Sequence, residues 1–246
     1  MNDKSLMTII IPAYNEASRL PQTLTRVLAF VESRPEKLDV IVVNNNSRDE
    51  TREIADGFAR KCSFLQVLDQ PVQGKGAAVR KGILEATGAY AFICDADLAM
   101  PIKELPRFFP EVLGRTYDIA IGSREVQGAQ RFDEPSYRHL MGRAFNFVVR
   151  TLAVPGIQDT QCGFKAFRRE AGQAIFSTQK IDGFAFDVEV LAIARRWEYG
   201  IVEIGIPWYY GPGGSVHPLR DSWRMFREVV RIRRNVAAGL YDRATQ

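Results

Sequence analysis

Short apolar runs alternate with longer stretches of mixed polar and apolar residues through the first half of the 246-residue chain. The runs at 6–11 and 40–43 are apolar at almost every position, which is typical of strands covered by helices on both faces. The longer stretches fit amphipathic helices. The pattern predicts strands at 6–11, 39–43, 64–68 and 90–94, and helices at 18–32, 49–61 and 75–86.

Alternating strands and helices predict an α/β fold with an open, doubly wound, mainly parallel sheet flanked by helices. The second half is less regular and ends in a basic segment that fits a C-terminal helical extension. Because no linker or repeat divides the chain, we expect a single domain over 1–246. The second half is predicted to contain strands at 118–121 and 201–206, and helices at 136–154, 187–197 and from 221 onwards.

The composition is that of a globular protein, with 46% hydrophobic and 25% charged residues, and it argues against a disordered chain. The net charge is only +4, but arginines gather between 220 and 234. A local basic cluster suits phosphate groups of nucleotides, lipid headgroups or nucleic acid, although a solvated helix face would have the same composition. No stacking platform or known nucleic-acid motif accompanies it, so nucleic acid is not an expected partner.

Three cysteines without a CxxC pair predict neither a disulfide framework nor a zinc site, as is usual in a reducing cytosol. The first sixteen residues lack the basic start of a signal peptide. A membrane-spanning helix needs about 18 consecutive apolar residues, and no stretch of the sequence is that long. We therefore expect a cytoplasmic location, with any membrane contact made from the surface by 136–154 and the basic C-terminal helix.

Ligands of open α/β sheets bind beyond the carboxyl ends of the strands, and polar residues gather there in this chain. Asp95 and Asp97 leave the fourth predicted strand one residue apart, so both carboxylates can reach one hard cation such as Mg²⁺ or Mn²⁺. A solvated turn is the alternative for so short a pattern. The polar segments after the four strands are 12–16, 44–49, 70–76 and 95–97.

Two of these segments suggest contacts with a nucleotide. Lys75 stands between two glycines at a predicted helix start, where backbone N–H groups favour an anion, although an ordinary helical turn would also fit. The spacing is not that of a P-loop, and no GxGxxG follows the first strand. Asn44, Asn45 and Asn46 offer amides that can hydrogen-bond a base or ribose, while Ser47 or Asp49 can cap the next helix.

With these loops in order, the chain resembles glycosyltransferase family 2, the inverting enzymes of GT-A fold, and within it the polyprenyl- or dolichyl-phosphate hexose synthases. Each motif is weak alone, but eight follow one another in the family's order over nearly the whole chain. The DTQCGFK segment is the one that points to a lipid-phosphate acceptor. The matching segments are IIPAYNE at 10–16, the loop 43–51, GKGAAVRKG at 74–82, DADLAMPI at 95–102, IGSR at 121–124, DTQCGFK at 159–165, FDVE at 186–189 and PLRDS at 218–222.

The resemblance implies a nucleotide-sugar-binding half at 1–124 and an acceptor-binding half at 125–246. It implies a metal site at Asp95 and Asp97, and catalytic roles for Asp97, Arg124, Asp159 and Lys165. It implies nucleotide-sugar contacts by Pro12, Tyr14, Glu16, Asn44, Asn45, Asn46, Lys75, Asp95, Ala96 and Asp97. On the acceptor side it implies contacts by Arg124, Gln161, Lys165, Asp187, His217 and Arg220, with Phe186 and Glu189 closing the pocket.

The implied reaction moves a hexose from a nucleoside-diphosphate sugar to a polyprenyl or dolichyl phosphate with inversion. UDP-glucose is favoured over GDP-mannose, because the motifs look closer to glucosyl relatives. One departure concerns the second loop, where the family usually has VDDGS and this chain has Val43-Asn44-Asn45-Asn46-Ser47. An ionised aspartate only accepts hydrogen bonds, whereas asparagine also donates, so base preference depends on this loop.

Three other functions remain open at this point. A family member with a soluble or protein acceptor would not need lipid. A nucleotidyltransferase also uses paired aspartates on an α/β sheet, but releases pyrophosphate. A nucleotide- or lipid-binding module with little or no catalysis would fit the missing acidic pair of the second loop.

Overall fold

A seven-stranded sheet forms the centre of the structure, a computed structural model that describes residues 5–211 and 218–243. Its strand order is β3–β2–β1–β4–β7–β5–β8, and a separate parallel pair joins β6 and β9. The strands are β1 (Met7–Ala13), β2 (Leu38–Asn44), β3 (Leu65–Asp69), β4 (Tyr90–Ile93), β5 (Ile119–Ser123), β6 (Gln130–Phe132), β7 (Lys165–Arg168), β8 (Ile201–Gly205) and β9 (Pro207–Tyr209).

The sheet is parallel except at β7, which lies antiparallel between β4 and β5. This confirms the predicted α/β class and the mainly parallel, doubly wound sheet. The sequence did not predict β7, because a four-residue strand that begins with a lysine is too short to give a periodic signal. The first three strands are added toward one edge of the sheet and β4 is added on the opposite side of β1, so the strand order reverses between β1 and β4. Ligand crevices of doubly wound folds form at such a point.

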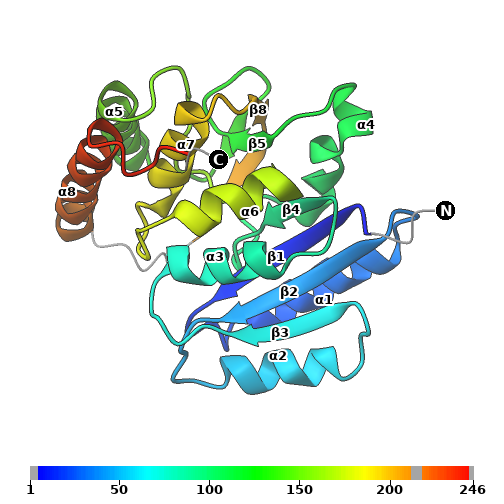
Figure 1. The fold of residues 1–246 in the computed structure, drawn as a ribbon. Coiled ribbons are helices and arrows are strands. Elements are labelled where there is room, and N and C mark those ends of the chain that lie inside the picture. Colours follow the sequence, from blue (N-terminus) through cyan, green and yellow to red (C-terminus); the bar gives the residue numbers. More distant parts are fainter. Residues whose placement is uncertain (1–4, 212–217, 244–246) are drawn as a thin grey trace.

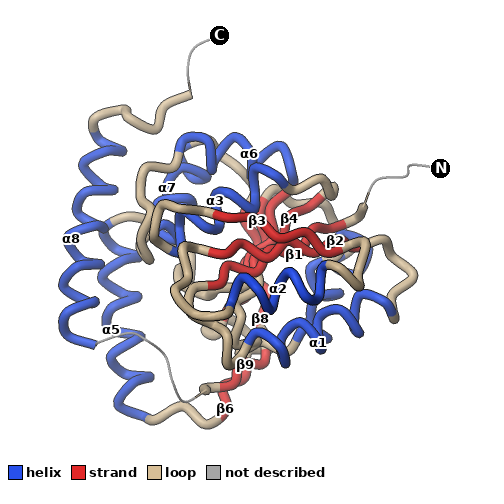
Figure 2. Tube along the Cα trace, turned by 90° about the horizontal axis from the view of Figure 1, so that it is seen from below, coloured by secondary structure: helices blue, strands red, loops and turns tan. Residues whose placement is uncertain are grey.

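Helices cover both faces of the sheet: α1 and α2 lie on one face, and α3, α6 and α7 on the other (Figures 1 and 2). The long helices α5 and α8 pack side by side at one end of the sheet (Figures 1 and 2). A 3-10 helix spans Ile102–Phe108. The α-helices are α1 (Leu20–Glu32), α2 (Thr51–Ala59), α3 (Lys75–Glu85), α4 (Pro110–Leu113), α5 (Ser136–Leu152), α6 (Arg169–Thr178), α7 (Phe186–Arg196) and α8 (Pro218–Ala237).

The pattern of apolar residues explains how these elements pack. In α1, Leu20, Leu24, Val27 and Val31 recur at helical spacing and are all buried against the sheet. The β1 strand is buried on both faces, as its unbroken apolar run predicts. The predicted helices at 18–32, 49–61, 75–86, 136–154 and 187–197 are all present with slightly different ends, whereas α6 was not predicted and α8 begins three residues earlier than expected.

An aromatic cluster fills the core beneath the end of β4. The ring centre of Phe92 lies 5.0 Å from that of Phe108 and 6.2 Å from that of Phe164, and all three side chains are buried. The three cysteines are buried and free, which agrees with the absence of a disulfide framework. Within 5–211 and 218–243, none of the helices combines the length and apolar character that crossing a bilayer demands.

Replacing Phe92 by alanine should destabilise the fold strongly, because the cavity left between two other phenylalanines cannot close. We expect Phe92→Ala to lower the free energy of unfolding by about 3–5 kcal/mol, measured by urea denaturation with circular dichroism. Val112→Ala is the matched control, since Val112 is 62% exposed and its truncation should change stability by less than about 0.5 kcal/mol. Equal effects of the two variants would contradict this account of the core.

Candidate active site

The two carboxylates after β4 lie at the point where the strand order reverses, next to the loop that follows β1. Asp95 Oδ1 lies 2.7 Å from Lys75 Nζ. Its carboxylate also lies against Gly163, where a Cβ atom would overlap Oδ2. Burial alone would lower the pKa of Lys75, but the negative charges of Asp95 and Asp187 raise it above its ordinary value. The lysine therefore carries its positive charge at neutral pH.

The turn that carries Asp97 is fixed by two hydrogen bonds. The Ala99 N–H donates to Asp97 Oδ1 at 3.0 Å, and the Thr23 hydroxyl on α1 donates to the Ala96 carbonyl at 2.5 Å. Burial raises the pKa of Asp97, and the neighbouring charge of Asp95 raises it further. The two carboxylates thus repel each other, and a cation beside them would relieve that repulsion.

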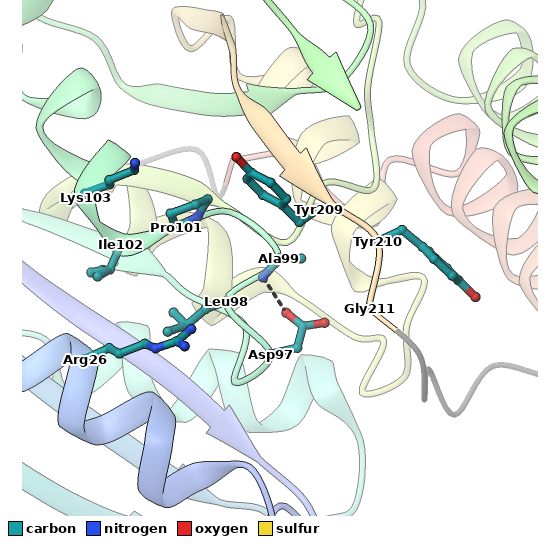
Figure 3. Close-up of a pocket in the computed structure, with 10 residues that line it drawn as sticks. All are labelled: Arg26, Asp97, Leu98, Ala99, Pro101, Ile102, Lys103, Tyr209, Tyr210 and Gly211. Carbon is teal, nitrogen blue, oxygen red and sulfur yellow. Dashed lines mark hydrogen bonds between the residues drawn. The ribbon is translucent and has the colours of Figure 1, made fainter. Parts of the chain in front are cut away.

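A cavity of about 480 Å³ opens beside Asp97. Figure 3 shows Asp97 with its hydrogen bond to Ala99, the side chains of Arg26 and Lys103 on one side, and Tyr210 on the other. The cavity is wide enough for part of a small ligand and brings a carboxylate, two cations and two phenols to one place. Its lining residues are Arg26, Asp97, Leu98, Ala99, Pro101, Ile102, Lys103, Tyr209, Tyr210 and Gly211.

The carboxylates fit a hexacoordinate cation such as Mg²⁺ or Mn²⁺ only in part, because they supply two side chains. Among the described residues, no group of three or more histidine, cysteine, aspartate or glutamate side chains is placed to hold a metal. Mg²⁺ sites of this kind are completed by water and by phosphate oxygens of the substrate, so two carboxylates beside an open cavity suit the ion. The donor set is therefore compatible with a metal that arrives with a diphosphate.

The turn before α3 is packed so closely that it requires its two glycines. Gly74 has φ +143°, and a Cβ atom there would overlap the backbone carbonyl of Asp182. A Cβ atom on Gly76 would lie 2.6 Å from the Ile181 carbonyl oxygen. This close packing sets the start of α3, and with it the position of Lys75 opposite Asp95.

Each asparagine of the second loop has its own structural partner. Asn44 Nδ2 donates to Asp69 Oδ1 at 2.8 Å, and Asp69 also pairs with Arg52. Asn45 is buried; its amide donates to the carbonyls of residues 70 and 72, and its Oδ1 accepts the Gly74 N–H at 2.8 Å. Asn46 is exposed and has φ +59°, at the position where the family pattern has glycine. The loop therefore braces the 70–74 segment as well as facing the site.

The loop after β1 joins the same edge of the sheet. The Glu16 side chain pairs with Arg19 at 2.8 Å, and its N–H donates to Thr51 Oγ1 at 2.8 Å. Burial raises the pKa of Glu16, against the effect of Arg19, and the charge of Asp97 also contributes. Pro12 is half-buried near the end of β1, Ala13 after it is buried, and the Tyr14 side chain is exposed beyond the strand. These residues surround the site without forming a direct contact with Asp95.

Arg124 and Asp159 form a paired unit on the other side of the site. Arg124 Nε and Nη2 donate to the two Asp159 oxygens at 2.7 and 2.9 Å, and the Arg124 backbone N–H donates to Oδ2 at 3.0 Å. Burial alone would raise the pKa of Asp159, but the Arg124 charge lowers it to about 2. The guanidinium also lies over the Trp208 ring, 5.4 Å from its centre.

Lys165 is fully buried, and its ammonium group is hydrogen-bonded to other groups of the protein. It donates to Asp187 Oδ1 at 2.6 Å and to the Cys162 carbonyl at 2.5 Å. Burial raises the pKa of Asp187, although Lys165 and Lys75 oppose that shift. The structure thus pairs Lys165 with Asp187, whose charge acts on Lys75, and Lys165 itself does not line the cavity.

The remaining predicted residues are spread over the second half of the chain. Gln161 Nε2 lies 3.7 Å from the sulfur of Met225 on α8. Phe186 and Glu189 are fully buried at the start of α7, and neither side chain lines the cavity. His217 lies outside the described residues, and the Arg220 side chain is likewise not described, although its backbone belongs to α8.

The family Glycosyl transferase family 2 matches residues 8–176, which include the Asp95–Asp97 turn and most of the site described above. The chain belongs to this family. The chain is 32% identical to dolichyl-phosphate β-glucosyltransferase from Dictyostelium discoideum over 252 residues, covering 97% of this chain and 77% of that protein. The Homo sapiens dolichyl-phosphate β-glucosyltransferase is also 32% identical, over 253 residues that cover 96% of this chain and 77% of that protein.

Solved structures with the same fold include glucosyl-3-phosphoglycerate synthase from Mycobacterium tuberculosis in complex with Mn²⁺ and UDP-Glc. That structure has a TM-score of 0.65 and 18% identity, covering 94% of this chain and 78% of that chain. The complex of the same protein with UDP has a TM-score of 0.64 and 19% identity, with 94% and 79% covered. These similarities confirm the GT-A-like α/β fold of this family 2 chain.

Several residues around this candidate site could not be found from sequence motifs. Tyr209 and Tyr210 line the cavity from the end of β9, and Trp208 lies under Arg124. Glu203 on β8 accepts the backbone N–H groups of residues 158 and 159 at 2.8 and 3.0 Å and so fixes Asp159. The aromatic run at 208–210 was the available signal, but nothing in it specifies which strands it will face.

The contact between Gly163 and Asp95 gives a direct test of the site. We expect Gly163→Ala to displace the Asp95 carboxylate and to weaken Mn²⁺-supported UDP binding by at least about 10-fold, measured by isothermal titration calorimetry. Gly142→Ala is the matched control, since a Cβ atom there would meet no atom within 4 Å. Unchanged binding in Gly163→Ala would show that the Asp95 position is not critical for the nucleotide.

Proposed function

We propose that the chain transfers a hexose from a nucleoside-diphosphate sugar to a polyprenyl or dolichyl phosphate, and that it inverts the sugar to give a β-linked lipid-phosphate sugar. The observation that carries the proposal is the Asp95 and Asp97 pair, in which Asp95 is bound to Lys75 and Asp97 lines a cavity that also contains Arg26 and Lys103. Relatives named dolichyl-phosphate β-glucosyltransferases, 32% identical over almost the whole chain, support the lipid-phosphate acceptor. Their names favour glucose as the sugar, and the donor in this proposal is UDP-glucose, with GDP-mannose next.

The chemistry asks the protein to bring two anions together. The acceptor phosphate is already ionised near neutral pH, so the attack on the anomeric carbon needs no strong general base. Mg²⁺ or Mn²⁺ held by Asp95 and Asp97 would supply positive charge to the leaving diphosphate. Lys75, whose ammonium is held at Asp95, adds a second cation on the same side.

Arg124 is the candidate for holding the acceptor phosphate. Its Nε and Nη2 atoms are bonded to Asp159, which fixes the plane of the guanidinium. No hydrogen bond within the described residues uses Nη1, so this nitrogen is left to meet a phosphate oxygen. Asp159 acts as the anchor of Arg124, and Lys165 and Asp187 support Lys75 from behind. Attack from the side opposite the diphosphate then inverts an α-linked donor.

The face formed by α5 and α8 is the proposed place of contact with a membrane surface. Phe147 on α5 is 67% exposed and Trp223 on α8 is 65% exposed. The Trp223 ring stacks on Phe226, with ring centres 5.8 Å apart. Aromatic side chains beside arginines on one amphipathic helix suit the interface of an anionic bilayer, where a polyprenyl phosphate would be presented. Peripheral binding on the cytoplasmic face follows from this proposal.

The reaction is tested with purified protein, a short polyprenyl phosphate, Mg²⁺ or Mn²⁺, and UDP- or GDP-sugars, scoring nucleoside diphosphate and lipid product. We expect lipid-dependent release with UDP-glucose, and a loss of at least about 100-fold in Asp97→Ala, because transition-state charge is no longer balanced. Glu111→Gln, an exposed carboxylate on α4, should keep full activity.

Other outcomes of this screen identify other functions. Release of nucleoside diphosphate that does not depend on lipid but rises with a soluble phosphorylated compound would show that this compound, and not a lipid, is the acceptor. Pyrophosphate in place of nucleoside diphosphate would indicate a nucleotidyltransferase. Nucleotide binding without any release would indicate a binding module.

Membrane contact is tested by sedimentation with vesicles of phosphatidylglycerol and phosphatidylcholine. We expect Trp223→Ala to weaken vesicle binding several-fold, roughly the effect of withdrawing one large aromatic ring from the interface. Val112→Ala, which removes an exposed apolar side chain far from α8, should bind as the unaltered protein does. Vesicle binding that is equal in both variants would argue against this face.

A further inference from the structure

The segment 179–182 between α6 and α7 supports the glycine turn that presents Lys75. The Ala77 N–H donates to the Asp182 carbonyl at 3.1 Å, and Arg80 pairs with the Asp182 carboxylate at 2.9 Å. The Gly76 backbone lies so close to the Ile181 carbonyl that a Cβ atom would come within 2.6 Å. A shift of this segment would therefore move the start of α3 and the lysine on it.

Glu189 holds the same segment from the other side. Its Oε1 accepts the Lys180 N–H at 3.0 Å, and its Oε2 accepts the Ile181 N–H at 2.8 Å. The side chain is fully buried on α7. Burial raises the pKa of Glu189, against the hydrogen bonds that stabilise its charge. A buried carboxylate of this kind keeps its place only while its donors are in position.

The third donor to Glu189 comes from beyond α8. The Tyr241 hydroxyl donates to Glu189 Oε1 at 2.6 Å and accepts a hydrogen bond from Asn235 Nδ2 at 2.8 Å. Trp197 Nε1 donates to the Tyr241 carbonyl at 2.7 Å, and the Tyr241 side chain is fully buried. The chain after α8 is thus hydrogen-bonded to Glu189 in the first turn of α7 and to Trp197 just after its last residue, and it lies far along the sequence from the glycine turn.

We propose that Tyr241 and Glu189 are positioning residues that tie the C-terminal end of α8 to the donor-binding turn. The path runs from the Tyr241 hydroxyl through Glu189 to the backbone of 180–182, and from there to 74–77 and Lys75. Removing the hydroxyl leaves the buried carboxylate with two donors instead of three, so its hold on residues 180 and 181 weakens. The inference rests on the proposed function, because it assigns the turn to a nucleoside diphosphate.

The test compares Tyr241→Phe with Tyr199→Phe. Both changes remove one phenol hydroxyl near the C-terminal segment, and among the described residues the Tyr199 hydroxyl makes no hydrogen bond, while its ring contacts Trp197 and Arg243. We expect Tyr241→Phe to weaken UDP binding in the presence of Mn²⁺ by about 3- to 10-fold in calorimetry. Hydrogen exchange should become faster in peptides that cover 74–80 and 179–182. Tyr199→Phe should change neither quantity.

Glu189→Gln gives an independent variant with nearly the same shape. In the sugar-transfer assay, it and Tyr241→Phe should raise the donor KM by a similar factor and change kcat less, because the displaced turn is the one that carries Lys75 on the donor side. A lower melting temperature with unchanged UDP affinity and unchanged exchange at 74–80 would overturn the inference and leave only a structural role. If the unaltered protein bound no nucleoside diphosphate at all, the proposed function would fail first, and the inference with it.

Discussion

The close approach of two carboxylates at the end of β4 is the constraint on which the surrounding structure depends. Asp95 and Asp97 repel each other, and burial raises the pKa of Asp97 in addition. The positive charge of Lys75 offsets this repulsion, with its Nζ atom 2.7 Å from Asp95 Oδ1. The glycine turn that positions Lys75 has no room for a side chain at Gly74 or Gly76. Gly163 makes room for the Asp95 carboxylate from the opposite side. The placement of Lys75 opposite Asp95 therefore depends on backbone close packing as much as on charge.

Behind this site lies a layer of buried ion pairs that hold the side chains of Lys75 and Arg124 in place. The Lys165–Asp187 pair stands behind Lys75, and Asp159 fixes the plane of Arg124. Breaking such a pair is costly, since it leaves an uncompensated charge in the interior. Rigid placement would suit the proposed reaction between two anions, because cations that are already in position need no reorganisation.

The second loop, at 43–47, is where this chain departs from the pattern of its family. The family pattern has an acidic pair there, and this chain has asparagines whose amides donate to Asp69 and to the backbone of 70–72. Asp69, at the end of β3, supplies a negative charge beside this loop and pairs with Arg52 on α2. The loop keeps its shape by a different set of bonds, and the left-handed residue Asn46 stands where glycine is usual.

The sequence by itself determined the α/β class, the first four strands and their helices, and the segments that meet at the carboxyl edge. These follow from periodicity and from parallel strands, which bring their carboxyl ends to one edge whatever the details of packing. Only the tertiary structure decided that β7 inserts antiparallel between β4 and β5, that Lys165 is buried, and that Tyr241 reaches Glu189. The reason is physical: a short strand, the burial of a charge and a contact across 52 residues depend on which surfaces meet, and local spacing carries no record of that.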